Sequence, residues 1–437
     1  MNVKAPIAAA RLLFRNGLVF DGSGAPPVPG DVVVRGATIE SVRVGGGTVA
    51  EDGDTVVDCT GATVMPGLVE SHAHLTFPSA VGHLDTRFNP PLDVSFFREL
   101  PPPDELLAIA RRNAGILLRA GFTSAYSAGS LTPVPTEVQL KTELEQGVSR
   151  GPRLRAASFE RDNNPVRLGP DGPRPVATGP EAVRAFVREQ AALGFDSVKL
   201  LLSNDDVFVS GGSRVTQYSA AEAAAAGEQA RESGVLLNCH AQSSQAVELA
   251  VRHGFRSIYH CTYADEAAVD LLEEHKDEIF LSPAVGIMWA NVHEGAEFGI
   301  DADRAEAMGS VAALAAQQEL YQELRRRGLR VLPGGDYGFP NNPIGRNARD
   351  LQLFVDLFGY TPAEALRAAT YLGGLLMRRP VGLLTGGYLA DLLVVRGDPC
   401  RDVSLLQDPE NLLAVLQDGE FAHRAPRLRS EPAGAAR

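Results

Sequence analysis

The sequence has little cysteine and tryptophan and lacks a long apolar run. Its four cysteines in 437 residues include no Cys-x-x-Cys pair, which favours reduced thiols over a disulfide framework. No stretch approaches about 18 uninterrupted apolar residues, so no membrane-spanning helix is expected. The apolar patch near the N-terminus is short and is interrupted by Arg11 and Arg15, which is not typical of a signal peptide. We therefore expect a cytoplasmic protein with no membrane partner.

Nucleotide-binding fingerprints and excess positive charge are also missing. No Gly-x-Gly-x-x-Gly follows a predicted strand, and there is no P-loop, so nucleotide-binding folds lose support. The formal net charge of −13 repels phosphate backbones, which makes nucleic acid an unfavourable partner. Hydrophobic residues make up 44% of the chain and charged residues 22%, so there is enough apolar material for a large folded core.

Lysine is rare, and one lysine stands in an unusual context. The chain contains only Lys4, Lys141, Lys199 and Lys276, and its other basic residues are arginines. Lys199 lies within the apolar run FDSVKLLLS. Because a buried ammonium is costly to keep charged, it either reaches solvent or a carboxylate, or it is neutralised and used.

The two ends of the chain differ in pattern from the middle. Residues 1–65 and 384–437 are rich in short β-type runs with Gly and Asp between them, which predicts one composite β-sandwich domain. Residues 66–383 contain about eight short apolar runs that alternate with helical stretches. This α/β pattern favours a closed (β/α)8 TIM barrel over an open doubly wound sheet.

Two segments of the predicted barrel appear as long connections. Residues 75–103 follow the first strand and are rich in proline, and residues 284–303 follow the seventh strand. Long loops in compact domains are often functional lids, but they also serve as decoration or as contacts between subunits. The sequence leaves these readings open.

Metal-ligating side chains recur at the predicted carboxyl ends of the barrel strands, where barrel enzymes place their chemistry. Two residues apart on an extended strand, the imidazoles of a His-x-His pair face the same way. Imidazole and carboxylate ligands suit Zn²⁺ or a similar divalent ion. Each residue alone is more often structural, but the coincidence of all six favours a metal site: His72, His74, Lys199, His240, His260 and Asp336.

Several motifs occur together in one order along the chain. They are VMPGLVESHAHL, GPRLRAA, DSVKLLLS, TQYS, NCHAQ, SIYHC, LPGGD and the C-terminal run AATYLGG to VLQDGE. In this set the sequence resembles the amidohydrolase superfamily, and within it the imidazolonepropionase-like and prolidase-like branch. That branch includes dipeptidases acting on basic C-terminal residues, ochratoxinase-type amidases and phenylurea hydrolases.

The resemblance implies a role for each matching position. His72, His74 and Asp336 would bind one metal ion, and His240 and His260 would bind a second. Lys199, as N6-carboxylysine, would bridge two divalent ions, with Zn²⁺ expected, together with a hydroxide. Asp336 would also move a proton from that hydroxide to the leaving nitrogen. Tyr218, in TQYS, matches a tyrosine that the branch uses near the substrate, where its phenol would stabilise the oxyanion.

The chain departs from the branch where a substrate would bind. ASFERDNN replaces a common Gly-Gly-His run, and AYSAGS replaces an acidic Val-Arg-Asp ending. Tyr126, Arg161 and Asn163 are therefore candidate specificity residues, although each is also consistent with an ordinary loop residue. Trp289 and His293 add aromatic surface that would suit a bulky apolar ligand or would simply pack.

The expected activity is hydrolysis of a C–N bond in a small molecule: an amide, an N-acyl amino acid or dipeptide, or an aryl urea. A metal-dependent deaminase of the same fold, a lactone or ester hydrolase, and a scaffold without metals remain alternatives. Related deaminases use one metal, lack the bridging lysine and carry glutamate where this chain has Ser243. We expect a homo-oligomer from the resemblance alone.

Overall fold

The structure, a computed structural model, describes residues 11–84, 101–130, 132–163, 166–169, 172–175, 177–207 and 211–433. These residues divide into two compact units. One contains the described residues up to Val69, Leu118–Thr123 and those from Thr361 onward, and the other contains Glu70–Leu117 and Ser124–Tyr360. None of the described helices has the length and apolar character needed to span a membrane.

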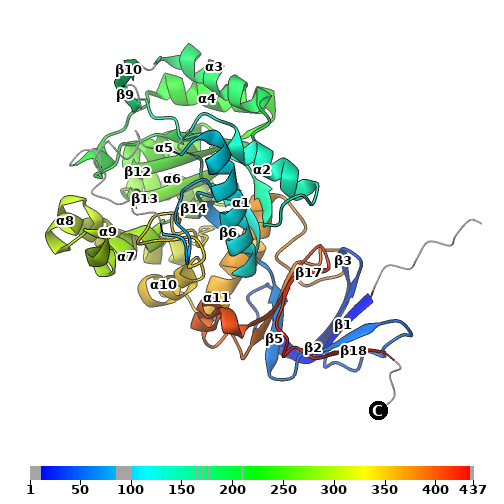
Figure 1. The fold of residues 1–437 in the computed structure, drawn as a ribbon. Helices are drawn as coiled ribbons and strands as arrows, with labels where there is room; N and C mark the ends of the chain where they lie inside the picture. The colour runs from blue at the N-terminus through cyan, green and yellow to red at the C-terminus, as the bar shows by residue number, and fades with distance from the viewer. Residues whose placement is uncertain are drawn as a thin grey trace, which may run out of the picture. The chain divides into compact units, whose positions relative to one another are not determined.

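The first unit is built around a nine-stranded sheet to which both ends of the chain contribute (Figure 1). Its strands are β1 (Arg11–Val19), β2 (Val28–Arg35), β3 (Thr38–Val44), β4 (Thr55–Asp58), β5 (Ala62–Pro66), β15 (Leu392–Arg396), β16 (Leu412–Gln417), β17 (Glu420–Arg424) and β18 (Ser430–Pro432). The helical segments are α11 (Pro362–Arg367), η5 (Ala368–Leu372), α12 (Gly373–Met377), η6 (Val403–Gln407) and η7 (Pro409–Asn411).

The strand β1 lies at the centre of this sheet. Its first half pairs in parallel with β4, its last two residues pair in parallel with β5, and it also pairs antiparallel with β2. The N-terminal and C-terminal parts of the chain meet where β5 pairs antiparallel with β15. Apolar residues of these strands, among them Phe14, Val32, Val64 and Val394, form one buried cluster that stabilises the unit.

The second unit carries two parallel sheets and a series of helices. Its strands are β6 (Leu68–Ala73), β7 (Phe122–Ser127), β8 (Arg153–Arg155), β9 (Val166–Gly169), β10 (Gly172–Pro175), β11 (Ser197–Leu201), β12 (Leu236–Ser243), β13 (Ser257–Tyr263) and β14 (Phe280–Ser282). Its helices are α1 (Pro103–Arg119), α2 (Thr136–Glu145), α3 (Pro180–Ala192), η3 (Gly212–Arg214), α4 (Ala220–Ser233), α5 (Ser244–Arg252), α6 (Glu266–Glu274), α7 (Val285–His293), η4 (Gly295–Phe298), α8 (Ala302–Ala307), α9 (Ser310–Arg326) and α10 (Arg349–Phe358).

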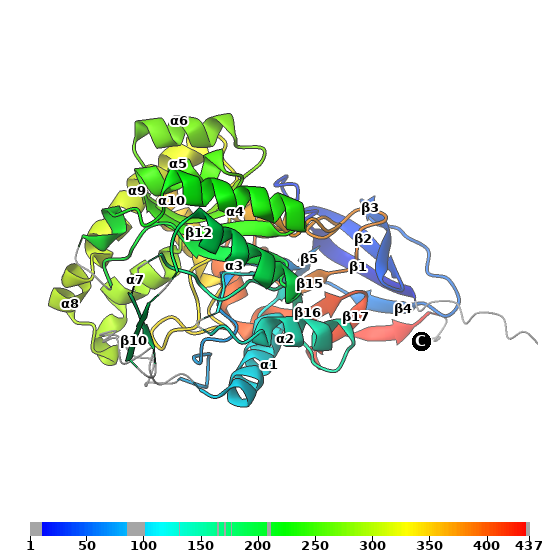
Figure 2. The same ribbon diagram turned by 90° about the horizontal axis from the view of Figure 1, so that it is seen from above.

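In both parallel sheets, neighbouring strands are consecutive in the sequence. One sheet has the order β6-β7-β8 and the other β11-β12-β13-β14. Single parallel bridges connect Ala157 with Ser197, Leu281 with Val331, and Ala73 with Tyr337. The predicted eighth strand is reduced to the bridge at Val331. The α/β class is confirmed, and Figure 2 shows α3 and α4 packed side by side among the helices of this unit.

Helix starts in this unit follow local sequence signals. Ser219 and Glu222 form a reciprocal capping box at the start of α4. The side chain of Ser243 accepts a hydrogen bond from the Ala246 amide and caps α5 directly after β12. The strand β12 is therefore followed at once by α5, and β13 is followed within three residues by α6.

The prediction that residues 284–303 form a long loop is wrong. This segment contains α7, η4 and α8. Ile287 and Met288 on α7 pack with Ala313 of α9 in a small apolar cluster, and this burial stabilises the helix. Residues 75–103 are described only in part, because 85–100 lie outside the described residues.

Replacing Phe14 by alanine tests the role of the nine-stranded sheet. Phe14 is fully buried on β1, so Phe14→Ala should lower the free energy of unfolding by about 3–5 kcal/mol. Val44 on β3 is 72% exposed, and Val44→Ala should change it by less than about 0.5 kcal/mol. Urea denaturation followed by circular dichroism measures both. Equal effects of the two substitutions would contradict the assignment of Phe14 to the core.

Candidate metal centre

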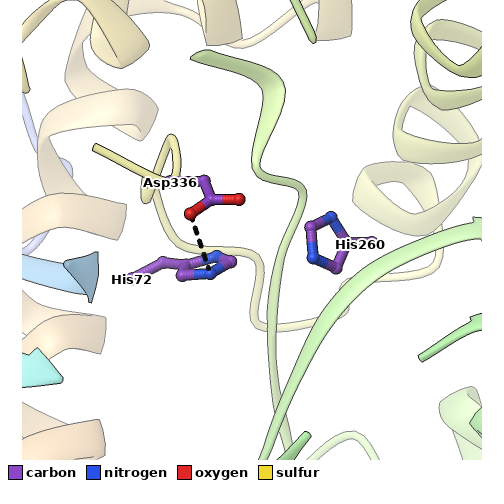
Figure 3. Close-up of side chains that lie close together, drawn as sticks. All are labelled: His72, His260 and Asp336. Atoms are coloured by element: carbon purple, nitrogen blue, oxygen red, sulfur yellow. Dashed lines mark ion pairs between the residues drawn. The ribbon is translucent and has the colours of Figure 1, made fainter. Parts of the chain in front are cut away.

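Three side chains from separate parts of the second unit converge on one point. His72 lies on β6, His260 on β13, and Asp336 follows the bridge at Val331. Each offers one ligand atom, and these three atoms lie within 4.8 Å of one another. Figure 3 shows the arrangement, in which His72 Nε2 lies 3.8 Å from Asp336 Oδ1. This spacing is compatible with ligation of a single divalent cation.

The backbone at this point adopts conformations that side chains rarely take. His260 has φ 73°, Cys261 φ 49° and Asp336 φ 60°, all in the left-handed region. A Cβ atom added to Gly334 would lie 2.5 Å from the hydroxyl oxygens of Ser282 and Ser71. The Gly-Gly-Asp turn therefore needs glycine, because the chain passes close to neighbouring strands before it presents Asp336. Such strained positions concentrate at functional sites.

His74 lies beside this cluster and contacts Asp336 as well. Its Nε2 is 3.0 Å from Asp336 Oδ1, and its ring centre is 5.4 Å from that of His72. On the other side of the ring, Nδ1 is 2.7 Å from the carbonyl oxygen of Gly129 and 3.4 Å from Oε1 of Glu160. Burial opposes protonation of His74, but Asp336 and Glu160 outweigh it and raise the pKa of this imidazole.

His240 lies beside His260. Its ring centre is 4.3 Å from that of His260. Its Nε2 is 3.3 Å from the carbonyl oxygen of Asn204 and 3.7 Å from Oδ2 of Asp205. Burial, assisted by the positive charge of Lys199, lowers the pKa of His240 to about 4. His240 is therefore neutral at physiological pH, which is the form that binds metals.

Lys199 is buried at the same place. It is 1% exposed, its Nζ donates a hydrogen bond to the Ala128 carbonyl over 2.9 Å, and it lies 4.5 Å from the centre of the Tyr259 ring. Burial, followed by the charge of Lys199, holds the pKa of His72 well below its usual range. The structure thus brings the six predicted metal-site residues into one neighbourhood. They form the metal-site group: His72, His74, Lys199, His240, His260 and Asp336.

The buried nitrogens of two histidines support a metal in this neighbourhood. In the part of the chain that the structure describes, Nδ1 of His72 and Nδ1 of His260 are buried without a hydrogen-bond partner. Burial also lowers the pKa of His260 well below the usual value, so both rings are neutral. Neutral imidazoles with unsatisfied nitrogens beside a carboxylate fit a divalent cation.

Three predicted substrate residues take part in local hydrogen bonds. The Tyr218 hydroxyl donates to the Arg161 carbonyl over 2.9 Å and accepts from Arg161 Nη1 over 3.1 Å. Asn163 Nδ2 donates to the Gln217 carbonyl and to Glu222 Oε1. Burial raises the pKa of the Tyr218 phenol, so it is a neutral donor at physiological pH. Tyr218 and Arg161 thus form one unit, and the single phenolic proton is already engaged.

Tyr126, Trp289 and His293 are placed differently from the metal-site residues. Tyr126 is fully buried on β7. The rings of Trp289 and His293 on α7 lie 4.8 Å apart, and the Arg349 guanidinium lies 5.1 Å from the Trp289 ring. Within the described residues, no ring contact or ion pair joins these three to the metal-site group.

Sequence reasoning missed the carboxylates that surround the site. Glu160 contacts His74, Asp205 contacts His240, and Glu70 accepts a hydrogen bond from the His72 amide over 2.8 Å. Burial, followed by the charge of Asp350, raises the pKa of Glu70 to about 8. Glu160 and Asp205 could have been found, because both stand just beyond predicted strands, in FERD and NDD.

The sequence is similar to those of known proteins. Ochratoxinase of Aspergillus niger is 28% identical over 257 residues, which cover 57% of this chain and 51% of that protein. The chain therefore matches about half the length of this relative. An imidazolonepropionase of Rubrobacter xylanophilus is 26% identical over 418 residues, which cover 90% of each chain.

The fold also matches solved structures. A Xaa-Pro dipeptidase with methionine bound in its active site superposes with a TM-score of 0.79 and 22% identity, covering 94% of this chain and 99% of that one. A sequence profile of the amidohydrolase family matches residues 63–422. That range includes both parallel sheets and every residue of the metal-site group, and the chain therefore belongs to the amidohydrolase family.

Proposed function

We propose that this protein is a metal-dependent hydrolase that cleaves a C–N bond in an amide, an N-acyl amino acid or dipeptide, or an aryl urea. The observation that best supports this proposal is the convergence of four histidines, Asp336 and Lys199 beside the carboxyl ends of parallel strands. The Xaa-Pro dipeptidase among the similar structures supports a dipeptide as one candidate substrate.

Two metal ions are proposed, with Zn²⁺ as the first choice. His72, His74 and Asp336 would hold one ion, and His240 and His260 would hold the other. Lys199 would join them after its amine adds CO₂ and loses a proton, because a carbamate offers two oxygen ligands whereas an ammonium offers none. The buried Nζ supports this role, since a carbamate bound to two cations would remove the cost of an isolated buried ammonium.

The reaction needs a nucleophile, a polarised carbonyl and a proton carrier. Divalent cations in such sites lower the pKa of water and polarise a carbonyl oxygen. We assign the proton carrier to Asp336, whose carboxylate is 17% exposed and contacts both His72 and His74. Asp336 would take a proton from the attacking water and give it to the leaving nitrogen.

Tyr218 is proposed to donate a hydrogen bond to the developing oxyanion. For this step its hydroxyl proton must leave the Arg161 carbonyl, and the Arg161 guanidinium, which donates to the same phenol, would then accompany it. Asn163 would hold the segment that carries Arg161, because it hydrogen-bonds Gln217, the residue before Tyr218. Trp289 and His293 remain candidates for contacts with the leaving group.

We also propose the finer architecture predicted from the sequence. The bridges Ala157–Ser197, Leu281–Val331 and Ala73–Tyr337 support closure of the two parallel sheets into a (β/α)8 barrel over residues 66–383. The shared nine-stranded sheet supports a composite β-sandwich from residues 1–65 and 384–437. A homo-oligomer is proposed from the family resemblance.

A deaminase remains the second candidate function. Its expected glutamate position is occupied by Ser243, whose hydroxyl caps α5 and contacts Thr216 Oγ1 at 2.7 Å. A hydroxyl committed to these bonds is a poor substitute for an acid–base carboxylate, which favours the hydrolase. Metal content separates the candidates, because two equivalents support the hydrolase and one supports the deaminase.

Replacing Lys199 tests the bridging role. Lys199→Ala should reduce bound metal from two equivalents to one, because the second ion would keep only two imidazoles, and turnover should fall by at least 100-fold. Metal analysis of the zinc-loaded protein and initial rates on N-acyl amino acids, dipeptides and aryl ureas measure both effects. Lys276→Ala is the matched control, since that side chain is 41% exposed. Unchanged stoichiometry and rate in Lys199→Ala would refute the bridge.

Replacing Asp336 tests the proton carrier. Asp336→Asn keeps the shape of the side chain but removes its basicity, so the rate with saturating metal should fall by about 10²–10⁴-fold while the fold is retained. Single-turnover kinetics and circular dichroism provide the two readouts. Asp303→Asn, on the exposed start of α8, should leave the rate unchanged. An Asp336→Asn enzyme with the full rate would exclude proton transfer by this residue.

A further inference from the structure

Two histidines of the metal-site group, His74 and His240, make the same kind of contacts through one ring nitrogen. One nitrogen of each ring faces a backbone carbonyl, and a carboxylate lies just beyond it. For His74, Nδ1 lies 2.7 Å from the Gly129 oxygen and 3.4 Å from Glu160 Oε1. For His240, Nε2 lies 3.3 Å from the Asn204 oxygen and 3.7 Å from Asp205 Oδ2.

This arrangement determines which nitrogen of each ring carries the proton. A carbonyl and a carboxylate both accept hydrogen bonds, so the nitrogen that faces them must be the donor. In His240, whose ring is neutral, the other nitrogen, Nδ1, then presents its lone pair. In His74 the other nitrogen, Nε2, faces the Asp336 carboxylate, and a bound cation would take the place of a proton between them. The Nε2 of His74 is the atom that lies 3.0 Å from Asp336, which is the direction of the proposed metal.

The backbone at Gly129 leaves room for the Glu160 carboxylate beside His74. Gly129 has φ +118°, and a Cβ atom added to it would lie 3.0 Å from Glu160 Cγ and 3.2 Å from Lys199 Cγ. Glycine at this position lets the Gly129 carbonyl reach His74 while the side chains of Glu160 and Lys199 pass alongside.

The carboxylate behind His240 is itself held in place. The amide of Val207 donates to Asp205 Oδ1 over 3.0 Å, and Gln242 Nε2 donates to Asp205 Oδ2 over 3.1 Å. Across the described ranges, no arginine or lysine forms an ion pair with Asp205 or Glu160, and each contacts a histidine instead. Their charges therefore face the histidines and the metals that these would bind.

We propose that Glu160 and Asp205 are a pair of positioning residues, one for each metal ion. Glu160 orients His74 at the first ion, and Asp205 orients His240 at the second. Each fixes the tautomer of its histidine and increases the basicity of the nitrogen that binds metal. The inference rests on the proposed two-metal function and adds two residues whose roles neither the motifs nor the family resemblance assigns.

Metal affinity measured without substrate tests the pair. Glu160→Gln and Asp205→Asn should each lower the affinity for one of two Zn²⁺ equivalents by about 10–100-fold and leave the other within threefold. Competition with a chromophoric chelator measures each affinity, and Co²⁺ absorption reports the geometry of the affected ion. Glu181→Gln is the matched control, since it removes one negative charge from a side chain that is 89% exposed and makes no contact with the histidines.

Combining each substitution with His240→Ala identifies the metal ion whose affinity each carboxylate affects. In His240→Ala, Asp205→Asn should have no further effect on metal affinity, whereas Glu160→Gln should still weaken the remaining ion. An equal effect of Asp205→Asn with and without His240 would overturn its assignment, because the charge would then act without the histidine.

The outcomes distinguish this inference from the proposed function. A wild-type protein that binds no divalent metal overturns the two-metal function itself. Two bound metals with unchanged affinities in both amide variants overturn only the positioning roles. If an amide variant does not fold, Glu160→Asp and Asp205→Glu replace it, since they keep the charge but change its distance. A tenfold loss in them supports positioning, and wild-type affinity overturns it.

Discussion

In the metal-free state, burial of several imidazoles around the Lys199 amine is the constraint on which the site depends. Protonated imidazoles next to Lys199 would repel it and one another in a region from which water is excluded. The protein avoids this because burial lowers the pKa values of His72, His240 and His260. The rings are thus kept neutral by the fold before any cation binds, and neutral imidazole is the ligand form.

His74 differs from these three histidines in its pKa. Its pKa is raised because Asp336 and Glu160 oppose the effect of burial from two sides. A cation placed between His74 and Asp336 would replace the proton that these groups now favour. Metal binding at this point should therefore be coupled to proton release, which makes the His74–Asp336 contact the place where protonation and metal ligation compete.

Asp336 is held in its left-handed conformation by a polar network on the loop that follows it. Asn342 Nδ2 donates to the carbonyls of Gly335 and Asp336 over 2.7 and 2.8 Å. Arg349 donates to Asn342 Oδ1, to the Gly286 carbonyl over 3.0 Å and to Glu294 Oε2 over 2.8 Å. The network therefore connects α7 to the Asp336 turn, and it accounts for the position of Trp289 beside the Arg349 guanidinium.

The site illustrates what a single sequence can predict. His72, His240 and His260 end apolar runs of strand length, so the rule that barrel chemistry lies at strand ends placed them together. Segment 284–303 was misread as a loop because α7 carries apolar residues on most of its positions and lacks the periodic pattern of an exposed helix. A strand end does not reveal whether its side chain points into the core, and so the burial of Tyr126 on β7 could not be predicted.

The two segments that depart from the family pattern meet behind one histidine. AYSAGS contains Gly129 and ASFERDNN contains Glu160, and both contact the same nitrogen of His74. Read separately in the sequence, these departures indicate altered substrate contacts. In this structure they meet at the support of one imidazole, since a glycine in one segment makes room for a carboxylate from the other. In the proposed two-metal function, these two segments would thus shape the metal environment without supplying a ligand themselves.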